Sequence, residues 1–233
     1  MKLRVAEVFS SIQGEGVWAG TPSVFVRVSG CNLRCVWCDT PYASWEPEGP
    51  TRQVEEIATE VVQLADGEVE HVVLTGGEPM LFAPIVPLAE RLKEHGFTIT
   101  VETAGTVYRD LPCDLMSVSP KLANSTPPER SGWRERHEEK RTNIEVLTKL
   151  VENYTHQLKF VVDPDQGGDI EEIETLLKRL PEIEPDRVLL MPEGTDTETL
   201  DRRTKLLVPI ALERGWGISP RLHIELYGNT RGT

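Results

Sequence analysis

The feature that most limits how this chain can fold is a repeated alternation of short apolar runs with longer stretches of helical periodicity. The apolar runs have strand length and lie at 23–29, 71–75, 97–102, 114–118, 157–162 and 187–191. Stretches with apolar residues at helical spacing lie at 53–65, 82–95, 142–153, 169–180 and 198–214. Alternation of this kind predicts a parallel α/β sheet or barrel.

The alternation contains about six β/α units, too few for a complete eight-stranded barrel. We therefore predict an α/β fold of the open, partial (β/α)6 type, with ligand chemistry at the mouth formed by the carboxyl ends of the strands. The whole chain, 1–233, is expected to be a single domain. The segment 122–141 is rich in Pro, Arg, Glu and Ser, and is expected to be a mobile surface excursion.

The composition narrows the class of partner. A formal net charge of −13 argues against a surface that neutralises nucleic-acid phosphates, so we expect a small-molecule substrate. No apolar run approaches the roughly 20 residues that span a bilayer, and the N-terminus lacks an apolar signal segment. We therefore expect a cytoplasmic protein that contacts no membrane.

Three of the four cysteines lie in the short run Cys31-Asn-Leu-Arg-Cys35-Val-Trp-Cys38. Disulfides within so short a run would be strained, which favours metal binding. Three thiolates hold a [4Fe-4S] cluster but leave one iron open to a small molecule, which indicates catalysis. A structural zinc site with Cys113 as fourth ligand is the alternative, although Cys113 is more simply a buried thiol. The histidines, at 71, 95, 137, 156 and 223, show no ligand spacing and are interpreted as ordinary.

Short polar motifs follow several of the predicted strands. They are Thr75-Gly-Gly-Glu-Pro79, Val101-Glu-Thr-Ala-Gly105, Ser119-Pro-Lys121 and Met191-Pro-Glu-Gly194. Because the carboxyl ends of parallel strands meet at one mouth, these motifs predict a ring of ligand contacts. The paired glycines would let the backbone approach a ligand closely.

The cysteine spacing, with the aromatic Trp37 before the last cysteine, resembles the signature of the radical S-adenosylmethionine (SAM) superfamily. The resemblance implies a partial barrel of the radical SAM kind, a [4Fe-4S] cluster on Cys31, Cys35 and Cys38, and a 5′-deoxyadenosyl radical derived from SAM. It places SAM against Trp37, Cys38, Asp39, Gly76, Gly77, Glu78, Ser119, Pro120, Lys121, Met191, Pro192, Glu193 and Gly194.

Further stretches resemble one family in this superfamily, the 7-carboxy-7-deazaguanine synthases of the queuosine (7-deazapurine) pathway. They are 9–16, 24–31, 38–40 and the ending 226–233. The resemblance implies conversion of 6-carboxy-5,6,7,8-tetrahydropterin to 7-carboxy-7-deazaguanine with loss of ammonia, by C6 hydrogen abstraction, ring contraction and regeneration of SAM. It implies substrate contacts from Ile12, Gln13, Gly14, Glu15, Arg27, Thr75 and Arg231, with the Arg27 guanidinium forked onto the carboxylate.

The same resemblance implies Mg²⁺ held by Thr40, a homodimer, and an electron donor such as flavodoxin or ferredoxin. Glu102 and Lys159 are the candidate catalytic residues. Two alternatives are a glycyl-radical enzyme activase and a non-catalytic zinc or iron–sulfur interaction protein. An activase must dock a large protein, and Arg27 and the run 13–16 weigh against it because they suit a carboxypterin instead.

Overall fold

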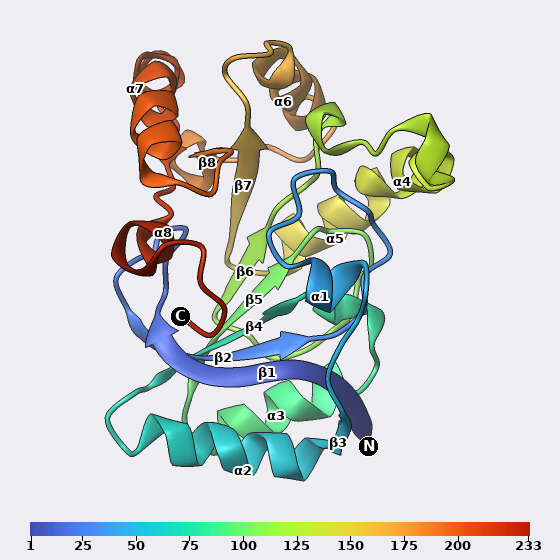
Figure 1. Cartoon of the computed structure of the whole chain (residues 1–233), viewed down its shortest axis with the longest axis vertical. Helices are drawn as coiled ribbons and strands as arrows, with labels where there is room; N and C mark the ends of the chain where they lie inside the picture. The colour runs from blue at the N-terminus through green and yellow to red at the C-terminus, as the bar shows by residue number, and fades with distance from the viewer.

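The computed structural model describes residues 1–233, and its centre is an open nine-stranded sheet (Figure 1). The strand order is β3-β1-β2-β4-β5-β6-β7-β8-β9. The strands are β1 (Lys2–Ile12), β2 (Pro22–Val28), β3 (Thr51–Gln53), β4 (His71–Gly76), β5 (Thr98–Thr103), β6 (Leu115–Val118), β7 (His156–Val162), β8 (Val188–Pro192) and β9 (Gly217–Ile218). Neighbours from β2 to β9 run parallel, whereas β1 is antiparallel to both β2 and β3.

Eight α-helices accompany the sheet, and the longer ones cover its outer side. They are α1 (Pro41–Ser44), α2 (Val54–Ala65), α3 (Ile85–Glu94), α4 (Arg134–Arg141), α5 (Ile144–Asn153), α6 (Asp169–Leu177), α7 (Thr197–Arg214) and α8 (Leu222–Tyr227). Helix α2 packs on β1 and β2, α3 on β5, α6 on β7 and α7 on β8. Side-chain caps fix the start of two helices. Asn143 accepts from the Val146 amide at 3.2 Å at the start of α5, and Asp196 accepts from the Thr199 amide at 2.8 Å at the start of α7.

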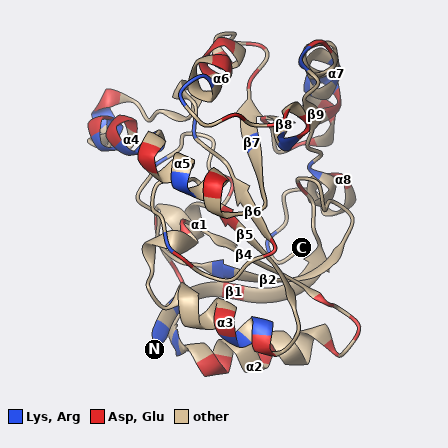
Figure 2. Ribbon diagram, turned by 180° about the vertical axis from the view of Figure 1, so that it is seen from behind, with Lys and Arg blue, Asp and Glu red and all other residues tan.

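The core lies between the sheet and these helices, as one cluster of 36 buried apolar residues. Strand β4 has five consecutive buried residues, as expected of a parallel strand covered on both faces. Figure 2 shows Lys and Arg interspersed with Asp and Glu on the outer helices rather than gathered on one face. No helix is both long enough and apolar enough to cross a membrane.

The open, partial (β/α)6 barrel is confirmed, and all six predicted strands are present. Strand β1 was not predicted, because its apolar residues do not form a continuous run and a bulge between Val5 and Glu7 interrupts its pairing with β2. The short elements β3, β9, α1 and α8 were also missed, since two to six residues carry too little periodicity to be recognised. Strand β1 matters for the site because its Glu7 accepts a hydrogen bond from Arg27 on β2.

The segment 122–141 is not the loose loop that its composition suggests. It contains the 3₁₀ turns Ala123–Ser125 and Glu129–Ser131, followed by helix α4. His137 on α4 is completely buried. We refer to residues 122–141 as the excursion segment; it lies outside the sheet, and its Ser125 carbonyl accepts from the Val36 amide at 3.0 Å.

Candidate active site

A cavity of about 290 Å³ opens at the carboxyl ends of the parallel strands. Twenty of the sequence-predicted site residues line it together. They are Ile12, Gln13, Gly14, Glu15, Arg27, Cys31, Cys35, Trp37, Cys38, Asp39, Thr40, Thr75, Gly76, Gly77, Glu102, Ser119, Lys121, Lys159, Met191 and Arg231. The structure thus gathers residues up to 219 positions apart (231 − 12) at the mouth that the α/β alternation predicted.

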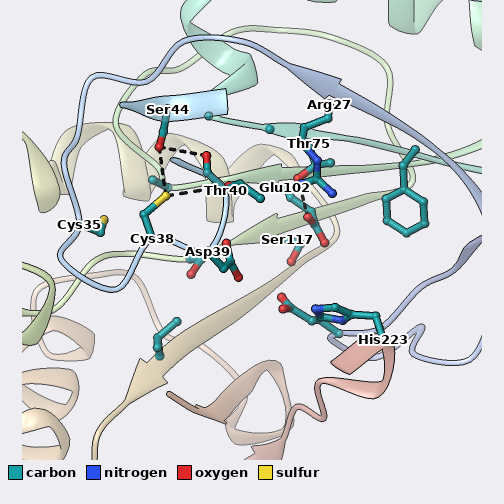
Figure 3. Close-up of a pocket in the computed structure, with 18 of the residues that line it drawn as sticks. Arg27, Cys35, Cys38, Asp39, Thr40, Ser44, Thr75, Glu102, Ser117 and His223 are labelled. Atoms are coloured by element: carbon teal, nitrogen blue, oxygen red, sulfur yellow. Dashed lines mark hydrogen bonds between the residues drawn. The ribbon is translucent and has the colours of Figure 1, made fainter. Parts of the chain in front are cut away.

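The cysteine loop, residues 30–40, follows β2 and brings three unpaired cysteines to this cavity. Cys31 and Cys38 pack beside the small buried cluster of Leu33, Cys35 and Ala104. The Cys38 sulfur lies 3.0 Å from the Ser44 hydroxyl oxygen (Figure 3), and the three sulfurs do not converge on one point.

The donor set of this loop fits an iron–sulfur cluster. Burial raises the pKa of the Cys31 and Cys35 thiols to about 12, so their thiolates need a nearby cation, which bound iron would provide. Cys113 precedes β6 and therefore lies at the amino ends of the parallel strands, whereas the cysteine loop follows β2 at their carboxyl ends. It does not line the cavity, so the loop has three local sulfur ligands and no fourth.

The paired glycines after β4 are required for packing against the cysteine loop. A Cβ on Gly76 would lie 2.1 Å from the Val28 carbonyl oxygen, and one on Gly77 would lie 2.3 Å from the Gly30 carbonyl oxygen. The Gly77 and Glu78 amides donate to those same two carbonyls, at 3.0 and 2.9 Å. The close approach predicted for these glycines is therefore made to the protein backbone itself, and it fixes the start of the cysteine loop.

Arg27 reaches the cavity from β2, and only the Nε of its guanidinium is hydrogen-bonded within the protein. Its Nε donates to Glu7 at 2.6 Å, and the same carboxylate accepts from the Tyr42 hydroxyl at 2.7 Å and from Arg231 at 3.3 Å. Arg231 also pairs with Glu48 at 2.8 Å, which lays the C-terminal tail along the cavity wall. Burial would raise the pKa of Glu7, but bonds from Tyr42 and Arg27 lower it, so Glu7 is a carboxylate.

Glu102 near the end of β5 accepts hydrogen bonds from two residues that are distant in sequence. Thr75 Oγ1 donates to one of its carboxylate oxygens at 2.7 Å, and Gln13 Nε2 donates to the other at 3.1 Å. Figure 3 shows Glu102 between Thr75 and Ser117 at the cavity wall. Gln13 and Thr75, predicted to contact the substrate, are therefore hydrogen-bonded to Glu102, a predicted catalytic residue.

A buried chain of charges runs beside this group. Glu15 forms ion pairs with Lys159 and, at 3.3 Å, with Arg221. Arg221 also pairs with Asp39 of the cysteine loop and donates to the Gly194 carbonyl at 2.5 Å. Burial acts to raise the pKa of Glu15, but the two cations outweigh it and the pKa is lowered; burial acts to lower that of Lys159, but Glu15 and Glu102 raise it. Lys159 is thus an ammonium ion at the cavity.

Residues predicted to contact SAM occupy the cavity wall near the cysteines. The Trp37 indole donates to Asn124 at 3.2 Å, which orients the ring. Lys121 Nζ donates to the Ser119 hydroxyl at 2.7 Å and lies 5.7 Å from the Trp37 ring centre. Met191 lines the cavity from the end of β8.

Five predicted SAM residues do not line the cavity: Glu78, Pro120, Pro192, Glu193 and Gly194. The Glu78 carboxylate is buried and accepts from Thr103 Oγ1 and the Ala104 amide, both at 2.8 Å. Glu193 forms an ion pair with Arg203, and its amide donates to Val162 at 2.9 Å. The carboxylates of Glu78 and Glu193 are thus bonded within the protein, and the contacts of all five residues with SAM stay predictions.

Several cavity residues were missed from the sequence. His223 on α8 lines the cavity, which corrects its interpretation as an ordinary histidine. It packs so closely that a Cβ on Gly14 would lie 2.0 Å from His223 Nδ1, and burial lowers its pKa. Tyr42, Ser44 and Ser117 also line the cavity. Tyr42, Ser44 and His223 lie on α1 and α8, which are too short to be recognised as helices, and Ser117 lies within the predicted strand β6, where no motif marks it.

Comparison with known proteins agrees with this geometry. A model of the radical SAM superfamily matches residues 25–180. A 7-carboxy-7-deazaguanine synthase of Halobacterium salinarum is 47% identical, over 99% of this chain and 93% of its own length. One of Rhodopirellula baltica is 45% identical, over 99% and 89%.

Solved structures show the same likeness. The crystal structure of QueE from Escherichia coli superposes with a TM-score of 0.68 at 25% identity and covers 96% of this chain and 95% of that one. Streptococcus suis SuiB bound to S-adenosylmethionine shares the fold alone, with a TM-score of 0.55 at 13% identity over 81% of this chain and 47% of that one. With three free thiols at the mouth of a partial barrel and relatives matching over its whole length, the chain belongs to the radical SAM superfamily and, within it, to the 7-carboxy-7-deazaguanine synthase family.

Proposed function

We propose that this chain converts 6-carboxy-5,6,7,8-tetrahydropterin to 7-carboxy-7-deazaguanine and ammonia. The observation that carries the proposal is the state of Arg27. Only its Nε is bonded within the protein, to Glu7, while its two terminal nitrogens are free in the cavity that holds the cysteine loop. A partly buried guanidinium with two free donors suits a substrate carboxylate.

The cofactors have a defined place in this proposal. A reduced [4Fe-4S] cluster with SAM supplies, when both are bound, a 5′-deoxyadenosyl radical for C6 hydrogen abstraction. Cys31, Cys35 and Cys38 would hold the cluster. SAM would lie against Trp37, Asp39, Gly76, Gly77, Ser119, Lys121 and Met191, which share the cavity with those cysteines.

The substrate would occupy the other end of the cavity. Phe9 and Phe25 stack with ring centres 5.0 Å apart and line the cavity near Arg27, so they provide an apolar wall for a flat pterin. Ile12, Gln13, Gly14, Glu15, Thr75 and Arg231 line the same cavity, and His223 lies against Gly14. Their donors and acceptors would hold the polar pterin edge.

Proton movement is assigned to Lys159 and Glu102. The Lys159 ammonium, held by Glu15, would donate a proton to the departing nitrogen. Glu102 presents a carboxylate fixed by Gln13 and Thr75, which would accept a hydrogen bond or proton from the ring. Fixed groups of this kind hold the rearranging ring and exclude water without solvent reorganisation.

Magnesium, an external reductant and a second copy complete the proposal. The Thr40 hydroxyl lines the cavity and is a hard oxygen ligand, which would hold Mg²⁺ together with substrate oxygens. Flavodoxin or ferredoxin would supply the electron. A homodimer is supported by exposed apolar side chains on the last two helices, with Leu212 78%, Leu226 53% and Tyr227 45% exposed.

The function is tested by anaerobic reconstitution of the cluster, followed by incubation with SAM, Mg²⁺, a reductant and 6-carboxy-5,6,7,8-tetrahydropterin. We expect equal amounts of 7-carboxy-7-deazaguanine and ammonia, many turnovers per SAM, and a slower reaction when Mg²⁺ is omitted. Slow release of 5′-deoxyadenosine with no deazaguanine would defeat the specific reaction while leaving the superfamily assignment intact.

The role of Arg27 leads to a separate prediction. Arg27→Ala is expected to raise KM for the carboxypterin roughly 10- to 100-fold, because a charge-assisted pair is lost. Arg27→Lys keeps the positive charge but loses the two parallel N–H donors of the guanidinium, so its KM for the carboxypterin should lie between those of the parent and Arg27→Ala. Steady-state kinetics with each substrate varied would check this, and KM for SAM should stay near the parent value. An unchanged carboxypterin KM in Arg27→Ala would remove Arg27 from the substrate site.

A further inference from the structure

The excursion segment sends a hydrogen-bond chain into the cysteine loop. The Arg34 amide donates to Nδ1 of His137 at 3.1 Å. Nε2 of His137 lies 2.9 Å from the Ser125 hydroxyl, which lies 2.6 Å from the Leu122 carbonyl oxygen. His137 and Ser125 are both fully buried, so no water competes for these bonds.

The chemistry of the end groups fixes the direction of every bond. An amide N–H can only donate and a carbonyl can only accept, so Nδ1 of His137 carries no proton and Nε2–H donates to Ser125, whose hydroxyl donates to Leu122. His137 is therefore the neutral Nε2–H tautomer. Burial lowers its pKa to about 4, in keeping with this state.

The same segment holds the loop at two more points on either side of Cys35. The Val36 amide donates to the Ser125 carbonyl at 3.0 Å. The Arg34 guanidinium stacks over Trp133 at 4.0 Å and donates to the Cys31 and Leu33 carbonyls at 3.0 and 2.7 Å. Both neighbours of Cys35 therefore have their amides bonded to the excursion segment, although the loop has no regular secondary structure around them.

We propose that His137 and Ser125 are positioning residues for the [4Fe-4S] cluster, ordering the backbone of the loop on both sides of Cys35 before iron arrives. Neither residue touches iron in this proposal. An irregular loop otherwise loses conformational entropy on binding, and supporting residues that order it beforehand reduce that cost. The proposal rests on the cluster alone and not on the pterin reaction.

The test measures how fast the cluster is lost. The reconstituted full chain is mixed anaerobically with an iron chelator, and the decay of the cluster absorbance is followed. His137→Leu removes both ring bonds and is expected to speed the loss roughly tenfold or more, on the scale of residues that support metal ligands. His137→Asn retains an acceptor near the Nδ1 position and should recover part of the retention.

His71→Leu is the matched control. His71 is also buried, is also bonded on both ring nitrogens, by Ser23 at 2.7 Å and Thr100 at 2.8 Å, and also has its pKa lowered to about 4. It lies at the start of β4, away from the cysteine loop. We expect His71→Leu to lower thermal stability about as much as His137→Leu but to lose its cluster at the parent rate. That result would show that faster loss in His137→Leu comes from the cysteine loop and not from general destabilisation.

The proposal is overturned if His137→Leu keeps its cluster as long as the parent, or if His71→Leu accelerates the loss equally. Should His137→Leu fail to fold, Ser125→Ala decides. That variant keeps the carbonyl bond to Val36 but loses the hydroxyl, and an unchanged rate of loss would reject the chain of bonds. A parent protein that holds its cluster yet makes no deazaguanine would defeat the proposed function and leave this inference standing.

Discussion

Cys35→Ala is expected to remove the [4Fe-4S] cluster and all measurable formation of 5′-deoxyadenosine and 7-carboxy-7-deazaguanine. Cys35 is the most buried of the three thiols, and two remaining cysteines leave two irons of the cluster without a protein ligand. Because the cluster would supply the electron that releases the radical from SAM, the whole rate enhancement should be lost, about 10⁶-fold or more on the usual scale of enzymes. Iron and sulfide analysis, with the visible absorption spectrum after reconstitution, would measure the first effect.

Cys113→Ala is the control for this variant. Cys113 is half-buried before β6, at the edge of the sheet opposite the cysteine loop, and should leave iron content and turnover near the parent values. Loss of metal in Cys113→Ala would instead point to a four-cysteine site, which is the zinc alternative. A brown, iron-containing Cys35→Ala protein would contradict the assignment of the loop.

Gly76 is not a predicted ligand of the cluster, yet Gly76→Ala is also expected to have a large effect, because it disrupts the packing beside the cavity. Gly76 has φ of +128°, and its added Cβ would lie 2.1 Å from the Val28 carbonyl oxygen and 2.4 Å from the Val28 nitrogen. Both are backbone atoms that cannot rotate away. Backbone strain and overpacking together should lower the free energy of unfolding by roughly 3 kcal/mol or more. Denaturant unfolding of the cluster-free protein would measure this.

Gly67→Ala separates the two causes. Gly67 also has a positive φ, of +75°, but a Cβ there would meet nothing within 4 Å. Only the conformational strain of an L-residue should appear, about 1 kcal/mol. If both variants were destabilised equally, the tight contact between β4 and the start of the cysteine loop would not be what makes Gly76 necessary.

The success of the sequence predictions follows from where their signals lie. The parallel strands were recognisable because burial on both faces makes each one a continuous apolar run, as in β4. The carboxyl ends of such strands share one edge, which is why motifs at 31–38, 75–79 and 119–121 meet although they are distant in sequence. Resemblance to a family then singled out residues whose types alone are uninformative, such as Gln13 and Thr75, and both line the cavity.

Short or polar elements were beyond this reasoning. Strand β1 carries Glu7 opposite Arg27 in the antiparallel pair, so the partner that orients this arginine comes from a strand that was not predicted. Arg221 and His223 belong to the start of a six-residue helix with little periodicity. Glu78 has the expected place in its motif, yet its carboxylate turns inward to Thr103 and Ala104.

The sequence by itself determined the α/β alternation, the grouping of three cysteines and the mouth at which they lie, because these depend on local spacing and strand direction. Only the tertiary structure decided which charges are neutralised and which remain free at the cavity, since ion pairs such as Glu15 with Lys159 join residues 144 positions apart. It also decided that the excursion segment supports the cysteine loop. That role rests on the buried His137 and Ser125, whose bonds form only when distant segments pack and exclude water.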